Sequence, residues 1–462
     1  MSLTLQDVSH AVRDTQYAVR GAIVARAAEL ERQGRRIIYC NIGNPQSLGQ
    51  KPLTFVRQIL ALSEYPELLD GPAAATFPED ARAAARLILR ESVHGLGAYT
   101  ESKGYRFVRR AVADFVRERD GIPADAEQVF LTDGASKGVQ SVLRLLVDAP
   151  SDGVMIPIPQ YPLYSASITL LGGAQVPYFL DEARDWSLSR EALETAHAEA
   201  VAKGIRVRAI AVINPGNPTG AVLDEENVAM MLDFARAHGL SVLADEVYQE
   251  NVYRPGDRFV SFASLLVRRG ILDVSLFSFH SVSKGFLGEC GHRGGYLECR
   301  NVPPDVMAEV EKLQSVALCA NSAGQIVTWV MVRPPRPGDP SFALFDRQRR
   351  EILESLRQRA ASLEKGLNAI EGIQCNALTG AMYAFPRIEL PRGVTDTAYC
   401  LALLEETGIC VVPGSGFGQL AGTWHFRTTI LPPPEEIETV VRRLGEFHAA
   451  FARARRPSPE PA

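Results

Sequence analysis

The sequence predicts an α/β protein with a mainly parallel sheet, and three observations lead to that prediction. Between about residues 76 and 330, strand patterns alternate with helical patterns, which is typical of βαβ units. Residues 207–213 form a continuous apolar run rich in β-branched side chains, as expected for a strand buried on both faces. Polar residues follow the ends of several predicted strands, where open α/β sheets bind their ligands.

The expected elements follow one another in a regular order. Two helices inside the alternating region are predicted at 135–147 and 225–238, because their apolar residues recur at helical spacing. The part of the chain beyond about residue 340 is helix-rich. The strands of the sheet are predicted at 129–132, 154–156, 174–179, 207–213, 240–244 and 272–279.

Length and composition indicate more than one structural unit. The chain has 462 residues, of which 46% are hydrophobic and 22% charged, and this is too long for one ordinary core. The Pro-rich segment 332–340 breaks any helix or strand and is the best candidate boundary. We expect an N-terminal arm with part of a small domain at residues 1–75 and a large domain at residues 76–335. A C-terminal small domain is expected at residues 336–452, followed by a disordered tail at residues 453–462.

The overall composition argues against several classes of protein. A net charge of −5 gives no reason to expect nucleic acid as a partner. No apolar run approaches the roughly 18–20 residues needed to cross a membrane. The seven cysteines are never spaced as CxxC and the eight histidines form no HExxH pair, so no metal site is expected.

Residues 9–34 form an Arg-containing amphipathic stretch that could be mistaken for a mitochondrial presequence. Acidic residues interrupt it at Asp14, Glu29 and Glu31, and presequences avoid acids. An ordinary structural helix is the preferred interpretation, and with it a soluble, cytoplasmic protein.

The first predicted strand end carries a possible phosphate seat. Asp133, Gly134, Ala135 and Ser136 follow the strand and open a helix, and the free N–H groups of a helix N-terminus bind anions. A simple helix cap is the alternative. No GxGxxG motif accompanies it, so a dinucleotide is not indicated.

The next two strand ends carry polar side chains as well. The turn Asn214-Pro215-Gly216-Asn217-Pro218-Thr219-Gly220 follows one strand and could be no more than a tight connection. Asp245 and Tyr248 follow another strand, where a surface loop is the alternative.

A lysine follows the last predicted strand, in the segment Ser281-Val282-Ser283-Lys284-Gly285, and Arg293 lies a little further on. Lysines are usually solvated surface charges. This one is flanked by small residues after an apolar strand, which favours a lysine that points into a cleft and reacts as a neutral amine or an imine.

Together these motifs resemble those of the fold-type I, class I/II aminotransferases, which depend on pyridoxal 5′-phosphate (PLP). They occur in the order of that family: phosphate seat, Asn turn, Asp with Tyr, Lys and then Arg. The resemblance extends from about residue 17 to residue 448. The runs most similar to the alanine aminotransferase group are residues 18–21, 154–166, 243–249, 288–291, 380–387 and 404–418.

The resemblance implies an enzyme with a large PLP-binding domain, a mainly parallel seven-stranded sheet and a smaller α/β domain. Lys284 would form a Schiff base with PLP and carry a proton between substrate and cofactor in a ping-pong transamination. Asp245 would face the pyridine nitrogen and keep the ring protonated. Tyr248 and Asn217 would form hydrogen bonds with the hydroxyl oxygen of the ring.

The resemblance also implies how the rest of the site is assembled. Tyr161 would stack on the ring, with a core aromatic as the alternative. Arg427 would grip the substrate carboxylate, helped by the backbone of Gly43. The phosphate would be held by Ala135 N–H, Ser136, Ser281 and Arg293, with Tyr99 reaching it from the neighbouring subunit of a homodimer.

Amino acids and 2-oxo acids are the substrates that this family implies, with L-alanine and 2-oxoglutarate as the leading pair. Transaminases for glyoxylate, aromatic amino acids or kynurenine are alternatives. More remote ones are a PLP lyase of the aminocyclopropane-carboxylate synthase type and a PLP-binding transcription regulator. The sequence departs from the family at Asn44-Pro45, at His292 and in the segment 315–321. Positions near Gly43 and Asn321 could line the substrate pocket, so these departures weaken the case for alanine.

Overall fold

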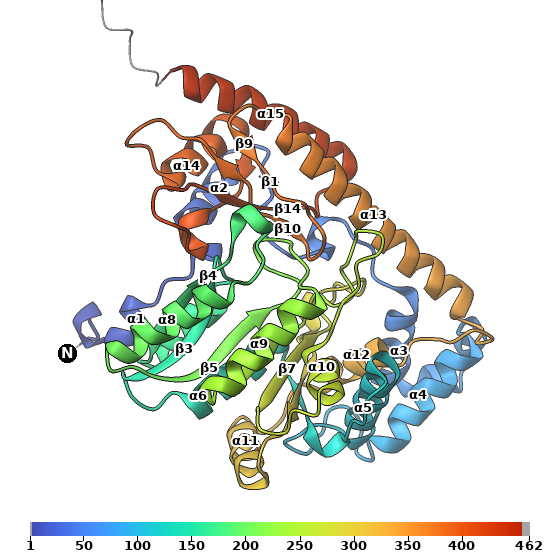
Figure 1. Ribbon diagram of the computed structural model, residues 1–462. Coiled ribbons are helices and arrows are strands. Elements are labelled where there is room, and N and C mark those ends of the chain that lie inside the picture. Colours follow the sequence, from blue (N-terminus) through green and yellow to red (C-terminus); the bar gives the residue numbers. More distant parts are fainter. Residues whose placement is uncertain (1, 455–462) are drawn as a thin grey trace, which may run out of the picture.

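The computed structural model describes residues 2–454, and a seven-stranded sheet forms its centre (Figure 1). From one edge to the other the strands are β2 (Val129–Thr132), β8 (Gly295–Arg300), β7 (Leu276–Ser281), β6 (Ser241–Asp245), β5 (Arg206–Ile213), β3 (Asp152–Ile158) and β4 (Ala174–Phe179). Strand β8 is antiparallel to both of its neighbours, and all other pairs in the sheet are parallel. The prediction of an α/β fold with a mainly parallel sheet is confirmed.

Alternate residues of the central strands pack against helices on opposite faces of the sheet. On β5, Ala209 and Ala211 belong to one buried cluster, and Ile210 and Val212 belong to another. This explains why the strand reads as an unbroken apolar run. The helices on the two faces are α6 (Ala135–Leu146), α7 (Leu163–Leu170) and α11 (Pro304–Val316), and α8 (Arg190–Ala202), α9 (Glu225–His238) and α10 (Phe262–Arg268).

A third buried cluster lies beside the β2 edge of the sheet. It is built by α3 (Thr54–Glu64), α4 (Glu79–Glu91), α5 (Arg106–Asp120) and α12 (Ser322–Val332). Every residue of α12 from Gly324 to Val332 is buried. This helix therefore runs through the interior and contacts both the sheet and the surrounding helices.

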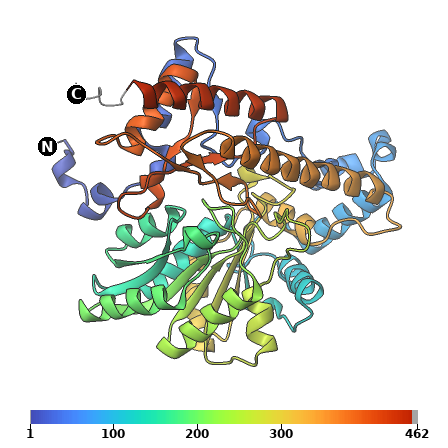
Figure 2. The same ribbon diagram turned by 45° about the horizontal axis from the view of Figure 1, so that its top comes forward.

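The N-terminal and C-terminal parts of the chain lie together above the sheet, as Figure 2 shows. Strand β1 (Ile38–Tyr39) pairs in parallel with β12 (Ile409–Cys410). The other short strands form two small sheets, β10 (Tyr383–Ala384), β14 (Phe426–Thr429) and β13 (Val412–Pro413), and β11 (Arg387–Ile388) with β9 (Ile373–Gln374). The helices of this region are α1 (His10–Asp14), α2 (Ala22–Arg32), α13 (Phe342–Asn368), α14 (Asp396–Thr407) and α15 (Pro434–Arg453).

The Pro-rich segment separates α12 from α13, as the sequence predicted. Helix α13 contributes Phe345 to the cluster beside the sheet edge and Leu356 and Leu363 to the cluster that includes the C-terminal strands. The domain bounds 1–75, 76–335 and 336–452 stay a prediction. Of the tail predicted at 453–462, Arg453 ends α15, and residues 455–462 lie outside the described part of the chain.

The structure corrects two details of the sequence analysis. Residues 9–34 form two α-helices with a short 3-10 helix (Ala18–Arg20) between them rather than one helix, and Ile23, Ala27 and Leu30 of α2 are buried. Strand β8 was not foreseen, although it lies inside the sheet. No helix within residues 2–454 combines the length and the apolar character needed to cross a bilayer.

Candidate active site

The predicted ligand-binding residues meet at one cavity of about 930 Å³ at the carboxyl ends of the strands. Ile213, Asp245 and Phe279 are level with one another across β5, β6 and β7, so the segments that follow these strands reach the same edge. All predicted site residues except Tyr99 line the cavity, namely Gly43, Ala135, Ser136, Tyr161, Asn217, Asp245, Tyr248, Ser281, Lys284, Arg293 and Arg427.

Lys284 lies just beyond β7 and points into the cavity. Its Nζ donates a hydrogen bond to the carbonyl oxygen of Gly43, 2.7 Å away, and lies 5.7 Å from the centre of the Tyr248 ring. The turn before it is fixed by Ser281, whose Oγ accepts a hydrogen bond from Ser283 N at 3.1 Å. The lysine is therefore a half-buried amine held inside a cleft, not a solvated surface charge.

Asp245 ends β6 and is buried, with 4% of its surface exposed. Tyr164 donates a hydrogen bond to its Oδ2 at 3.2 Å, and Val247 N donates to Oδ1 at 3.4 Å. Burial raises the pKa of Asp245 from 3.8 to about 6, although these two hydrogen bonds and the charge of Lys284 act in the opposite direction. A buried carboxylate with so few donors is suited to a cationic or N–H partner in the cavity.

Tyr383 is a site residue that the sequence analysis quoted only as part of a motif. Its phenol is hydrogen-bonded to that of Tyr248, and a Cβ atom on Gly43 would collide with its hydroxyl oxygen. Burial acts to raise the pKa of Tyr383, but the charges of Lys284 and Arg427 and the hydrogen bond from Tyr248 lower it. The short strand that residues 381–385 predict is present as β10, which begins at Tyr383, but a strand of two residues does not indicate what its side chains contact.

Arg427 of β14 lines the cavity and is buried, with 1% of its surface exposed. Its guanidinium lies 4.1 Å from the centre of the Tyr383 ring and 4.7 Å from that of Phe417. Nη2 donates to the carbonyl oxygen of Asn41 at 2.6 Å, and Nη1 donates to Oδ1 of Asn217 at 3.2 Å. The two rings and two acceptors fix the orientation of the guanidinium plane.

Arg427 forms no ion pair with a carboxylate among residues 2–454, and its Nε has no hydrogen-bond partner there. A buried charge without a counter-ion is costly. Both amide atoms of the neighbouring Asn41 side chain are likewise buried without a partner. The part of the cavity around Arg427 and Asn41 is therefore prepared for an anion that also offers hydrogen-bonding atoms.

The residues of the predicted phosphate seat line the same cavity. Helix α6 begins at Ala135, and no side chain caps its first turn. Arg293 approaches from the β7–β8 connection, where its Nη2 donates to Asp133 O at 3.0 Å. A Cβ on Gly134 would lie 2.5 Å from that Nη2, and Gly134 has a φ of +79°, so only glycine is compatible with this approach. Free N–H groups, Ser136 and Arg293 together suit a phosphate.

Asn321 supports this seat from outside. Its backbone N and its Nδ2 donate to Asp133 Oδ1 at 2.8 and 2.7 Å, and Nδ2 also donates to Arg293 O at 3.0 Å. Arg293 has a φ of +51°, which is unfavourable for a residue with a side chain. Asn321 is not among the residues that line the cavity of its own chain, and a place for this position in the substrate pocket stays a prediction.

Two predicted residues have contacts that the sequence did not suggest. The side-chain oxygen of Asn217 accepts a hydrogen bond from Arg427. Tyr161 shares a hydrogen bond of 2.5 Å between its hydroxyl and that of Tyr17, so the N-terminal arm closes one side of the cavity. Tyr99 is 80% exposed and lies outside the cavity of its own chain.

Comparison with known proteins gives a consistent result. The family described as aminotransferase class I and II matches residues 60–444. A Dictyostelium discoideum relative named "Probable alanine aminotransferase, mitochondrial" is 49% identical, over 97% of this chain and 89% of the relative. "Glutamate–glyoxylate aminotransferase 1" of Arabidopsis thaliana is 48% identical, over 97% of this chain and 96% of the relative.

A solved structure supports the same relationship. "Alanine aminotransferase from Pyrococcus furiosus" superimposes with a TM-score of 0.79 at 27% identity, covering 96% of this chain and all of the other.

The prediction of a cytoplasmic protein is contradicted by these relatives. The Dictyostelium relative is named mitochondrial, and so are two alanine aminotransferases of Arabidopsis thaliana that are each 48% identical to this chain. The cytoplasmic prediction rested on the acidic residues in 9–34. These residues belong to a stretch that forms helices α1 and α2 of the folded chain, and they do not indicate where the protein is located.

Proposed function

The chain belongs to the class I and II aminotransferases, and from that premise we propose that it is an alanine transaminase, which converts L-alanine and 2-oxoglutarate to pyruvate and L-glutamate. The observation that carries the proposal is the buried Arg427, which has no carboxylate partner within the described residues 2–454 and shares one cavity with Lys284. The names of several relatives support alanine as the amino donor.

Membership of this family implies PLP, and the residues at the cavity fit it. The free N-terminus of α6, Ser136, Ser281 and Arg293 would hold the phosphate. Asp245 would face the ring nitrogen, Tyr161 the ring face, and Lys284 would hold the aldehyde carbon. When bound, PLP supplies an electron sink for the carbanion that forms at the substrate α-carbon.

The side chains of the chain would then bind, orient and transfer protons. Arg427 would bind the substrate carboxylate through the guanidinium edge that its aromatic neighbours leave free, helped by the backbone near Gly43. This would fix the α-carbon near Nζ of Lys284, which can take up and return a proton when the amine is neutral. Asp245 would hold a proton on the ring nitrogen, and Tyr248 and Asn217 would orient the ring hydroxyl.

A second copy of the chain is part of the proposal. Tyr99 is exposed beside further exposed apolar residues, Val316 and Leu318, and the two segments touch through a hydrogen bond of 2.9 Å between Ser102 and Ser315. Exposed apolar groups of this kind suit a protein interface. Tyr99 would reach the phosphate in the site of the second copy.

Arg427→Lys is expected to lower kcat/KM for L-alanine by roughly 10- to 150-fold, since a planar charged donor contributes about 1.5–3 kcal/mol. Lysine keeps the charge but cannot make the two-point contact with a carboxylate. Steady-state kinetics at several alanine concentrations would measure the loss. Arg359→Lys, which changes an arginine bonded to the carbonyl oxygens of Leu431 and Pro432, is the matched control and should leave kcat/KM unchanged. Unchanged kinetics in Arg427→Lys would contradict the carboxylate role.

Glutamate–glyoxylate transamination is the second candidate. It is favoured by one specific finding, the 48% identity to an Arabidopsis relative that is named for that reaction. Both reactions use an α-carboxylate and a 2-oxo acid, so the same cavity and the same Arg427 serve either. The difference lies in which side chains the remaining space accepts.

A panel of amino donors and acceptors tests the proposal. L-Alanine with 2-oxoglutarate is compared with glutamate–glyoxylate, aspartate, tyrosine and kynurenine pairs on the purified, PLP-loaded protein. We expect the highest kcat/KM for alanine with 2-oxoglutarate. Brisk turnover of another pair with negligible pyruvate formation would overturn the alanine assignment and leave the aminotransferase family intact.

A further inference from the structure

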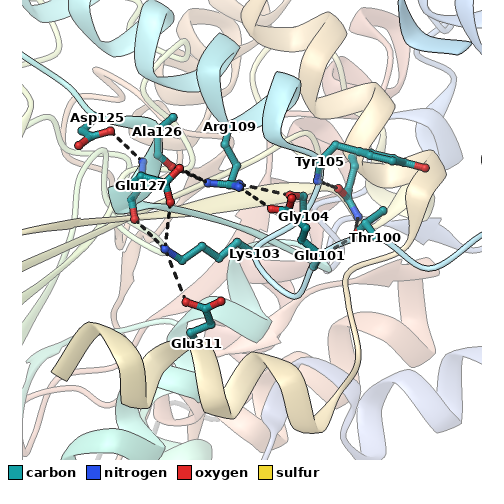
Figure 3. A network of polar contacts seen from close by, with 11 residues as sticks. Thr100, Glu101, Lys103, Gly104, Tyr105, Arg109, Asp125, Ala126, Glu127 and Glu311 are labelled. Atoms are coloured by element: carbon teal, nitrogen blue, oxygen red, sulfur yellow. Dashed lines mark hydrogen bonds and ion pairs between the residues drawn. The ribbon is translucent and has the colours of Figure 1, made fainter. Parts of the chain in front are cut away.

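A polar network outside the active site surrounds Arg109 of α5 (Figure 3). The side chain of Arg109 is only 3% exposed. It donates to Gly104 O at 3.2 Å and to Glu101 Oε2 at 2.7 Å. It also donates to Ala126 O and Glu127 Oε1, both at 3.2 Å. Arg109 thus ties the segment 99–105 to the turn that precedes β2.

Gln325 of α12 holds the same segment from the other side. Its Oε1 accepts a hydrogen bond from Tyr105 N at 2.8 Å, and its Nε2 donates to Thr100 Oγ1 at 3.2 Å and to Ala320 O at 2.8 Å. The residue is buried, with 2% exposure. Every hydrogen-bonding atom of this amide is used, so the backbone around Thr100 and Tyr105 is fixed to the interior of the protein.

Tyr99 lies at the start of this segment, and its side chain is exposed. The residues after it are anchored by buried groups, whereas its own side chain is 80% exposed. An exposed aromatic ring on a backbone that is already ordered loses little conformational freedom when it binds. Such an arrangement serves a binding role better than a structural one.

We propose that Arg109 and Gln325 are positioning residues for the cofactor site of a second copy of this chain, because they fix the segment 99–105 and so present Tyr99 to the partner's phosphate seat. The inference rests on the proposed function, in which Tyr99 reaches that seat. It adds that the geometry of Tyr99 is set by two buried side chains of its own chain, which touch neither cofactor nor substrate.

A purely structural role would act on a different site. Lys103 O accepts a hydrogen bond from Leu131 N of β2 at 2.9 Å, and β2 leads to the phosphate seat of the same chain. A general disturbance of the network would therefore weaken the chain's own site. A positioning role for Tyr99 weakens the site of the other chain.

Mixed dimers separate the two roles. Two chains with different affinity tags are co-expressed and the mixed form is purified. One chain carries Lys284→Ala, so that only the other, the reporter chain, can attach PLP covalently. After borohydride reduction, mass spectrometry measures the fraction of reporter chain that carries PLP as the PLP concentration is raised. Tyr99→Phe in the Lys284→Ala chain is the reference variant. It shows how far the half-saturating PLP concentration rises when the tyrosine hydroxyl is lost.

Gln325→Met is placed either in the Lys284→Ala chain or in the reporter chain. In the first arrangement the half-saturating PLP concentration should rise about tenfold, the equivalent of one or two hydrogen bonds. In the second it should stay within about twofold, although both mixed dimers carry the same two substitutions. Arg109→Lys should show the same asymmetry with a smaller shift, because lysine keeps the charge but not the four contacts.

Asp125→Asn is the matched control, since Asp125 belongs to the same network but lies outside the segment 99–105. It should shift neither arrangement. An equal shift in both arrangements, a larger shift when the reporter chain is altered, or no shift with Gln325→Met would each overturn the proposal. Absence of reducible PLP from an unaltered reporter chain would overturn the proposed function itself, which makes the two failures distinguishable.

Discussion

Lys284→Ala is expected to lower the turnover number by at least about 10⁴-fold, because one side chain supplies both the covalent attachment of PLP and the proton transfer. Its Nζ is the amine that the fold holds in the cavity, 2.7 Å from Gly43 O. The variant should also lose the borohydride-stable attachment of PLP, while PLP can still bind through the phosphate seat. Single-turnover kinetics and mass spectrometry of the reduced protein measure the two effects separately.

Lys284→Arg distinguishes chemistry from charge. Arginine keeps a cation at this position but remains protonated and forms no imine, so its activity should be as low as that of Lys284→Ala. Lys312→Ala, which changes an exposed lysine paired with Glu309, should leave the turnover number unchanged. A reducible PLP adduct with full activity in Lys284→Ala would show that another residue carries the reaction.

Asp245→Asn is expected to lower activity and raise the stability of the cofactor-free chain at the same time. Asparagine cannot hold a proton on the ring nitrogen, so we expect turnover to fall by about 10²–10³-fold, as for the loss of one well-placed electrostatic partner. In the cofactor-free chain, however, the carboxylate is buried and its pKa is raised from 3.8 to about 6. Ionising it there costs roughly 3 kcal/mol.

The sign of the stability effect follows from the direction of this shift. A carboxyl whose pKa is higher in the folded chain than in the unfolded chain binds protons more tightly when folded. Its contribution to stability is therefore present in full below about pH 4 and is lost as the pH rises through about 6. Asp245→Asn removes this loss, so the variant should unfold at higher urea than the parent at pH 8 and at similar urea at pH 4.

Asp152→Asn is the matched control, because it changes a buried aspartate whose pKa is shifted the other way. Although burial acts to raise the pKa of Asp152, hydrogen bonds from the backbone N–H groups of Asp148 and Ala149 and from Arg206 lower it. Its replacement should therefore destabilise the chain at pH 8 while leaving PLP attachment intact. If both variants changed stability in the same direction, the burial argument for Asp245 would fail.

The sequence was most informative at the ends of the apolar strands. Val129–Thr132 and Ala174–Phe179 were predicted to the residue, and the side chains that follow β5, β6 and β7 do meet at one cavity. Strands β5, β6 and β7 are parallel neighbours that are largely buried. They therefore give an unbroken apolar signal, and their carboxyl ends share one edge of the sheet. Site residues that follow these strands can therefore be located from the sequence alone.

Strand β8 was missed because its interior contains charge. Glu298 and Arg300 lie in the strand, almost completely buried, and form an ion pair of 2.5 Å. Burial raises the pKa of Glu298, although Arg300 and Arg119 act to lower it. A buried ion pair interrupts the apolar pattern by which a central strand is usually recognised.

The contacts between distant segments could not be predicted either. Tyr383 reaches Tyr248, and Arg427 reaches Asn41 O across almost the whole length of the chain. The hydrogen bonds by which Asn321 supports Asp133 and Arg293 were likewise not expected. Such contacts depend on how β14 and α12 dock, which local sequence patterns do not encode.

The burial of Arg427 determines which molecules the site excludes. A buried cation that lacks a counter-ion selects by the charge on the main-chain carboxyl group, not by the side chain. An amino acid inside a peptide, or one whose carboxyl group is an amide, has no such charge and would leave the guanidinium unpaired. Sites that lose a required polar partner in this way discriminate by about 10⁴–10⁵-fold. The same arginine that admits both a methyl and a carboxyethyl side chain would thus confine the enzyme to the free amino acid pool and exclude the far larger amount held in protein.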